Sequence, residues 1–147
     1  MSTVLYVDEQ PAMARAVSRW LASRGTGVQA ARTIAEAKHH FTTDAYDGVF
    51  IDLWLHDGSG FELYDWILEH QPALAGRVAF ITADVIHDSA ERERYRLIDR
   101  PVLVKPFDLA ELDRCVEQWG AVGRDRDRRR APSAGICEAR NEARDVT

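Results

Sequence analysis

The sequence predicts an α/β fold in which five parallel strands form a doubly wound sheet with helices on both faces. Short runs of β-branched and aromatic residues alternate with amphipathic helical patterns five times within the first 120 residues. Strands that alternate with helices favour a parallel sheet with right-handed crossovers. The runs are continuously apolar, which is typical of strands covered on both faces.

Five segments are predicted to be strands, each bounded by polar residues. The segment 28–31 is the weakest because it contains a single bulky apolar residue, Val28. The other four segments are 4–7, 49–51, 78–81 and 102–104. All five are short enough to be strands rather than buried helices.

Helices are predicted between the strands from their end signals and apolar faces. Pro11 begins the first helix and Gly25 ends it. Thr33 and Glu36 have the spacing of a capping box for the second helix. The third is expected over 61–70, a weakly patterned fourth over about 89–98, and the last after Asp108, which is followed by Glu111 three residues later.

The composition predicts one domain followed by a tail. The chain has 147 residues, of which 46% are hydrophobic and 29% charged, as expected for a single globular domain. We assign residues 1–120 to this domain. Residues 121–147 are rich in charge and lack an apolar period, so we expect a disordered tail. Two cysteines are too few for a disulfide scaffold or a four-cysteine zinc site.

The charge is unevenly distributed. Residues 121–147 carry seven arginines and five acids, a net +2, which leaves −7 for the first 120 residues of a chain with net charge −5. An acidic domain suits a cation better than nucleic acid. The apolar runs are too short to span a membrane, and no secretory leader is visible at the N-terminus. We therefore expect a cytoplasmic protein that does not contact membranes.

Polar residues that could carry chemistry follow four of the five strands. Asp8 and Glu9 follow the first, Asp52 the third, Thr82 the fourth and Lys105 the fifth. In such sheets the carboxyl ends of the strands form the ligand site. Three carboxylates at one edge repel one another, and a hard divalent cation such as Mg²⁺ removes that cost. With an ammonium and a hydroxyl beside them, these groups suit phosphoryl transfer and an aspartyl phosphate at one of the carboxylates.

These motifs resemble the receiver domain of bacterial two-component response regulators, of single-domain or hybrid-kinase-associated type. The resemblance extends over residues 2–119 and is carried by four segments, 4–9, 50–63, 80–83 and 104–107. Each motif is weak alone, but four in order at compatible spacings are specific. The resemblance implies a flavodoxin-like sheet with the strand order 2-1-3-4-5.

The resemblance also implies a role for each residue of the site. Asp52 is expected to accept a phosphoryl group from a sensor histidine kinase or a phosphotransfer protein. Thr82 and Lys105 are expected to contact the phosphoryl oxygens, and the Lys105–Pro106 peptide bond is expected to be cis. The expected Mg²⁺ ligands are Glu9 and Asp52 directly, Asp8 through a water molecule, and the backbone carbonyl of Trp54.

Two positions depart from the family pattern. Val102 stands where receivers usually carry an aromatic switch residue, and His56 stands where a proline is common. Output is expected through binding of a downstream protein, without direct DNA contact, because the 27 residues after 120 are few and polar. A homodimer is left open.

Two alternatives remain. An aspartyl-nucleophile magnesium phosphatase would carry a second aspartate two residues after the nucleophile, where this chain has Trp54. A degenerate receiver would act as an interaction module that does not need phosphorylation. The full set of site residues favours a phosphoacceptor that is not an enzyme, because it would catalyse only its own phosphorylation and dephosphorylation.

Overall fold

The computed structural model describes residues 2–83 and 100–129, with side chains described up to residue 120. The helix predicted over about 89–98 lies outside the described residues. No helix within the described ranges is both long and apolar enough to cross a membrane.

Five parallel strands form the central sheet, in the order β2-β1-β3-β6-β7. Counted along the chain, this is the predicted order 2-1-3-4-5, so the predicted fold is confirmed. The strands are β1 (Ser2–Val7), β2 (Thr26–Ala31), β3 (Gly48–Asp52), β6 (Val78–Thr82) and β7 (Val102–Val104). Every predicted strand is present, extended by at most two residues at either end.

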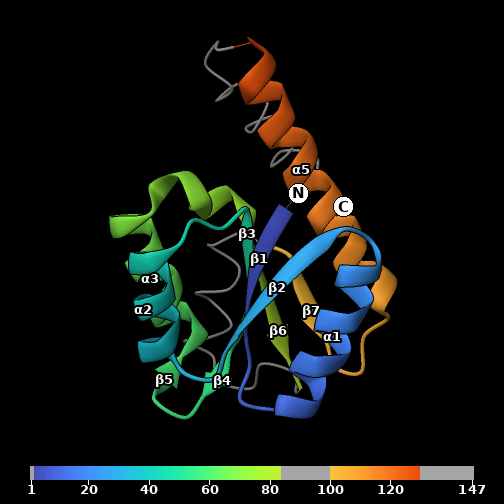
Figure 1. Cartoon of the computed structure of the whole chain (residues 1–147). Helices are drawn as coiled ribbons and strands as arrows, with labels where there is room; N and C mark the ends of the chain where they lie inside the picture. The colour runs from blue at the N-terminus through green and yellow to red at the C-terminus, as the bar shows by residue number, and fades with distance from the viewer. Residues whose placement is uncertain (1, 84–99, 130–147) are drawn as a thin grey trace.

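Helices cover both faces of this sheet (Figure 1). Helices α2 (Ile34–Thr43) and α3 (Gly60–His70) lie on one face. Helices α1 (Pro11–Ser23) and α5 (Leu109–Arg129) lie on the other. Each predicted start signal is found at the start of its helix: Pro11 is the first residue of α1, and Thr33 accepts a hydrogen bond from the Glu36 amide at 3.1 Å.

The core is divided in two by the sheet. On the side of α2 and α3, the rings of Phe61 and Tyr64 meet Phe80 edge to face. On the side of α1 and α5, the indole of Trp119 lies 5.0 Å from the ring of Phe50 and directly against the backbone of Gly48. A Cβ atom at Gly48 would come within 2.2 Å of that indole, so the close approach of α5 to β3 requires glycine.

Two short elements were not predicted. A hairpin of two-residue strands, β4 (Trp54–Leu55) and β5 (Gly58–Ser59), follows β3. A 3₁₀ helix, η1 (Pro72–Arg77), joins α3 to β6. Both are too short to show a periodic apolar pattern.

The predicted start of the disordered tail needs correction. Helix α5 continues to Arg129, nine residues beyond the boundary set at residue 120, and projects past the sheet (Figure 1). Residues 121–129 lack an apolar stripe, but arginine and alanine have high helix propensity and can extend a helix that has already begun. Residues 130–147 lie outside the described part of the chain.

Candidate functional site

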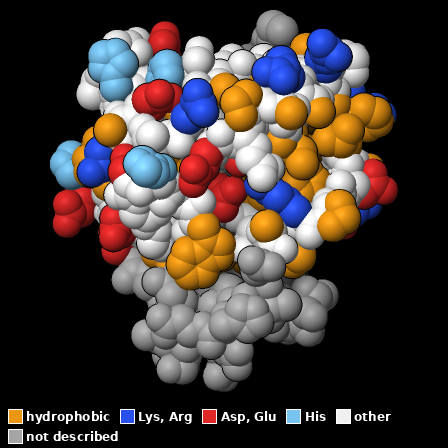
Figure 2. Space-filling view, turned by 90° about the horizontal axis from the view of Figure 1, so that it is seen from below, with side chains coloured by type: hydrophobic (Ala, Val, Ile, Leu, Met, Phe, Trp, Pro, Cys, Tyr) orange, Lys and Arg blue, Asp and Glu red, His pale blue; other side chains and the backbone are white. Residues whose placement is uncertain are grey.

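The sheet brings three of the predicted site residues to one edge. Asp8 directly follows β1, Asp52 is the last residue of β3, and Thr82 is the last residue of β6. These strands are neighbours in the sheet, so their carboxyl ends lie side by side. Asp8, Asp52 and Thr82 are only 1%, 6% and 2% exposed. Figure 2 looks onto this end of the molecule, where acidic side chains gather near the middle of the face.

Lys105 reaches the same place from β7. Its Nζ atom lies 2.9 Å from Oδ2 of Asp8 and 3.1 Å from Oδ2 of Asp52, so one ammonium bridges two buried carboxylates. The Lys105 amide also donates to the Thr82 carbonyl at 2.7 Å, which aligns the end of β7 with β6. The Lys105–Pro106 peptide bond is cis, as the resemblance implied.

The site carries unbalanced charge. Two carboxylates face one ammonium, so the cluster of Asp8, Asp52 and Lys105 is net negative when all three are ionised. Burial raises the pKa of Asp52 above its ordinary value, although the Trp54 amide and the Lys105 ammonium both favour the ionised form. Burial acts to lower the pKa of Lys105, but the hydrogen bonds and charges of Asp8 and Asp52 outweigh it, and the pKa is raised. The lysine is therefore firmly protonated.

Both carboxylates receive further hydrogen bonds. The Trp54 amide donates to Oδ1 of Asp52 at 3.0 Å. The Gln10 amide donates to Oδ1 of Asp8 at 3.0 Å, and the Tyr6 hydroxyl donates to Oδ2 of Asp8 at 3.0 Å. Tyr6 was not among the predicted site residues. The sequence does indicate it, because Tyr6 stands two residues before Asp8 and side chains two residues apart in a strand share a face.

The loop after Asp52 is held in place by two contacts that were not predicted. The Asp57 carboxylate accepts hydrogen bonds from the amides of Ile34 and Ala35, at 2.9 and 3.1 Å, and so caps α2 from a distant part of the chain. Gly60, at the start of α3, packs so closely that a Cβ atom would lie 2.5 Å from the Asp52 carbonyl oxygen. The loop after Asp52 is thus tied to both α2 and α3.

Glu9 and Trp54 are placed differently from the buried cluster. Glu9 lines a neighbouring pocket with Arg32 and His56, and the Trp54 side chain is 44% exposed. Within residues 2–83 and 100–120, no group of three or more His, Cys, Asp or Glu side chains is arranged to hold a metal ion. The ligand roles of Glu9 and of the Trp54 carbonyl therefore stay predictions.

The two converging carboxylates nevertheless fit Mg²⁺ by their chemistry. Asp8 and Asp52 supply hard oxygen donors at one point, and their combined charge exceeds that of the single ammonium between them. Mg²⁺ commonly binds through one or two carboxylates and keeps several waters. A third carboxylate in the cluster is not required for such a site.

A family model and a curated relative match most of this chain. The family model described as "Response regulator receiver domain" matches residues 4–117. A curated relative, the sensory transduction protein LytR of Staphylococcus haemolyticus, is 30% identical over 118 residues. That alignment covers 78% of this chain but only 43% of the relative, so the chain spans less than half of the relative's length.

Solved structures show the same fold. The non-phosphorylated HemR receiver domain from Leptospira biflexa aligns with a TM-score of 0.68 and 28% identity, covering 81% of this chain and 94% of that one. The response regulator TrrA from Thermotoga maritima, solved in complex with Mg²⁺-BeF, aligns with a TM-score of 0.68 and 23% identity. That alignment covers 81% of this chain and 99% of TrrA.

Proposed function

Because the chain belongs to the receiver domain family of two-component response regulators, we propose that Asp52 is its phosphoacceptor in a Mg²⁺-dependent reaction. The observation that carries the proposal is that the Lys105 ammonium lies 2.9 Å from the carboxylate of Asp8 and 3.1 Å from that of Asp52 at the end of the sheet. A buried carboxylate beside a fixed ammonium is poorly explained by stability alone, since burying charge is costly. The same groups are those that phosphoryl transfer needs.

In this reaction a carboxylate oxygen of Asp52 attacks the phosphorus of the donor. The new oxygen–phosphorus bond forms as the bond from phosphorus to the donor's leaving atom breaks, and the donor departs with that electron pair. Lys105 is already held at the site and offers its ammonium to the negative phosphoryl oxygens. The Trp54 amide holds the other carboxylate oxygen of Asp52 and so fixes its orientation.

Bound Mg²⁺ would supply further positive charge to the transferring group. Asp8 and Asp52 would hold it, and we retain Glu9 and the Trp54 carbonyl as proposed ligands. Thr82, buried at the end of the strand beside Asp52, is proposed to contact the phosphoryl oxygens once they are present.

The proposed phosphoryl donor is a sensor histidine kinase or a phosphotransfer protein, and the proposed output is binding of a downstream protein. The proposal includes no enzymatic activity on other molecules. A phosphorylation-independent interaction module is the main alternative, because Val102 stands where receivers usually carry an aromatic switch residue. A phosphatase is less well supported, because Trp54 cannot act as a general acid.

Incubation with acetyl phosphate and Mg²⁺ tests these functions. We expect a single phosphoryl adduct by intact-mass spectrometry, absent without Mg²⁺ and absent in Asp52→Asn. Asp44→Asn, which changes an exposed carboxylate at the far end of α2, is the matched control and should be phosphorylated normally. Absence of an adduct in the wild type would favour the interaction module. Steady turnover of phosphate esters would favour the phosphatase.

A further inference from the structure

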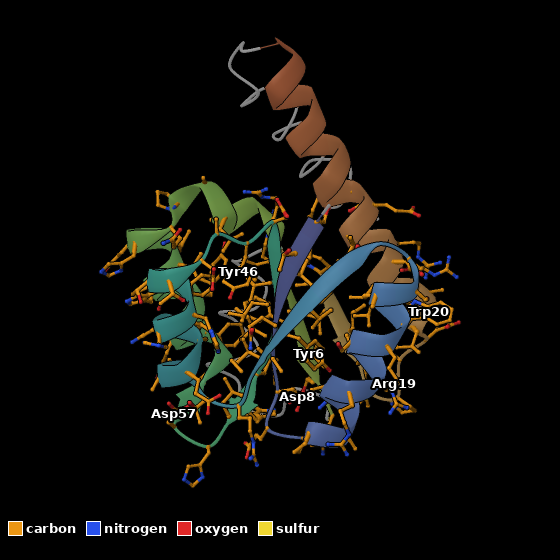
Figure 3. The ribbon with its side chains drawn as sticks, viewed as in Figure 1. Tyr6, Asp8, Arg19, Trp20, Tyr46 and Asp57 are labelled. Carbon is orange, nitrogen blue, oxygen red and sulfur yellow. The ribbon has the colours of Figure 1, made fainter. Side chains whose placement is uncertain are left out.

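Tyr6 lies near the end of β1, two residues before the proposed metal ligand Asp8, which directly follows the strand. Side chains alternate along a strand, so these two residues, two positions apart, point to the same face of the sheet. Figure 3 shows them one after the other toward the end of β1. The Tyr6 hydroxyl donates a hydrogen bond to Oδ2 of Asp8 at 3.0 Å, and Tyr6 is completely buried.

The ring of Tyr6 is fixed by the core. It belongs to the apolar cluster between the sheet and helices α1 and α5, and its centroid lies 6.2 Å from that of Phe50. A buried tyrosine hydroxyl needs a hydrogen-bond partner, and the Asp8 carboxylate provides it.

Three donors therefore hold the carboxylate of Asp8 from three directions. The Gln10 amide binds Oδ1, while the Tyr6 hydroxyl and the Lys105 ammonium share Oδ2. Lys105 also contacts Asp52, and it is expected to turn toward a phosphoryl group. The hydroxyl of Tyr6 comes from a rigid part of the core and can hold Asp8 when the lysine moves.

We propose that Tyr6 is a positioning residue for metal binding, which holds the Asp8 carboxylate in the orientation that Mg²⁺ requires. The inference rests on the proposed function, because it assumes that Asp8 is a ligand. Groups that hydrogen-bond to a metal ligand fix its orientation, and their loss commonly weakens metal affinity about 10–100-fold. Tyr6 fits this role because its hydroxyl is its only polar side-chain group and points at a ligand.

The test replaces Tyr6 with phenylalanine, which removes the hydroxyl and keeps the ring that packs in the core. We expect Tyr6→Phe to weaken Mg²⁺ binding about tenfold, measured by titration calorimetry of the full chain. Phosphorylation by acetyl phosphate should slow at low Mg²⁺ and recover at saturating Mg²⁺, because only affinity for the cation is lost. Tyr46→Phe is the matched control, since Tyr46 lies far from Asp8 (Figure 3), and should bind Mg²⁺ as the wild type does.

A second measurement keeps the test valid even if Tyr6→Phe folds poorly. A buried, hydrogen-bonded tyrosine hydroxyl proton exchanges slowly, and in the wild type its NMR resonance should shift when Mg²⁺ is added. An unchanged Mg²⁺ dissociation constant in folded Tyr6→Phe, or a hydroxyl resonance that does not respond to Mg²⁺, would overturn the positioning role while leaving phosphorylation of Asp52 intact. A wild-type protein that binds no Mg²⁺ would overturn the proposed function as well.

Discussion

The ammonium of Lys105 and the carboxylate of Asp52 are separated by 53 residues in the chain and by 3.1 Å in space. The side chains of both residues are about nine-tenths buried, and the same ammonium also contacts Asp8. Among the described residues, the Lys105 ammonium thus compensates part of the charge of both carboxylates. Several consequences for stability and function can be measured.

Replacing Lys105 with methionine should destabilise the protein in the absence of Mg²⁺. The variant leaves Asp8 and Asp52 buried without the Lys105 ammonium, and removing one partner of a buried pair typically costs about 3 kcal/mol. Urea unfolding with and without Mg²⁺ measures this loss, part of which the cation should restore. Lys38→Met, at a half-buried lysine near the Trp66 ring, is the control and should change the free energy of unfolding by less than about 1 kcal/mol. Equal stability of the Lys105 variant and the wild type would contradict the charge argument.

Asp52→Asn should stabilise the protein at neutral pH in the absence of Mg²⁺, by about 1 kcal/mol, although it abolishes phosphorylation. Burial raises the pKa of Asp52 in the folded state, so its ionised form is less favourable there than in the unfolded chain. This penalty is present at neutral pH and is relieved as the pH falls through the raised folded-state pKa. The gain measured by urea unfolding should therefore shrink at acid pH, and a destabilised variant at neutral pH would refute the prediction.

Asp57→Ala should destabilise the protein by about 1 kcal/mol, the usual cost of losing a helix cap. The amides of Ile34 and Ala35 hold the ionised carboxylate and lower its pKa although the small desolvation acts to raise it. The stabilisation is fully present above the ordinary carboxyl pKa of about 3.9 and is lost as the pH falls through the lowered folded-state value.

Thermal unfolding of the wild type and of Asp57→Ala, from neutral pH down through the carboxyl pKa, measures the stability that the Asp57 cap contributes. The difference in unfolding temperature between the wild type and Asp57→Ala should become smaller below about pH 4. Asp44→Ala, at the opposite end of α2, controls for loss of a carboxylate, and it should not be destabilised because an acid at a helix C-terminus is unfavourable. A constant difference down to low pH would show that the lost stability does not come from the ionised cap.

Gly48→Ala should destabilise the protein by about 1–3 kcal/mol, because the new methyl group would overlap the Trp119 indole. Denaturant unfolding followed by tryptophan fluorescence suits this test, since Trp119 is at the contact. Gly76→Ala is the control, because a Cβ atom there would meet nothing within 4 Å. If both glycine variants unfold at the same denaturant concentration, the packing of α5 on β3 is looser than described.

Most of the fold was predictable because the three central strands, β1, β3 and β6, are buried along most or all of their length. Such strands appear in the sequence as continuous apolar runs, and the helices between them carry recognisable start signals at Pro11, Thr33 and Asp108. The hairpin after Asp52 was not predictable in this way. Its two-residue strands are held by the contact of Asp57 with α2, which is a tertiary interaction between distant segments.

The site was predictable in part for a related reason. Polar residues that directly follow buried strands converge at one edge of a parallel sheet, and Asp8, Asp52, Thr82 and Lys105 do so. The role of Tyr6 is harder to predict, because this residue lies within a continuous apolar run that is typical of a buried strand. Only its position two residues before Asp8 indicates where its hydroxyl lies. Residues 121–129 of α5 carry no apolar stripe, so the sequence pattern does not indicate that the helix continues through them.

The direction of α5 separates the two ends of the molecule. The helix begins near the edge that holds Asp52 and carries the chain past the opposite end of the sheet, as far as Arg129 (Figure 1). A phosphoryl donor seated over Asp52 would therefore leave the distal turns of this helix uncovered. Within the described residues, the proposed phosphorylation site and the last turn of α5 therefore face different surroundings.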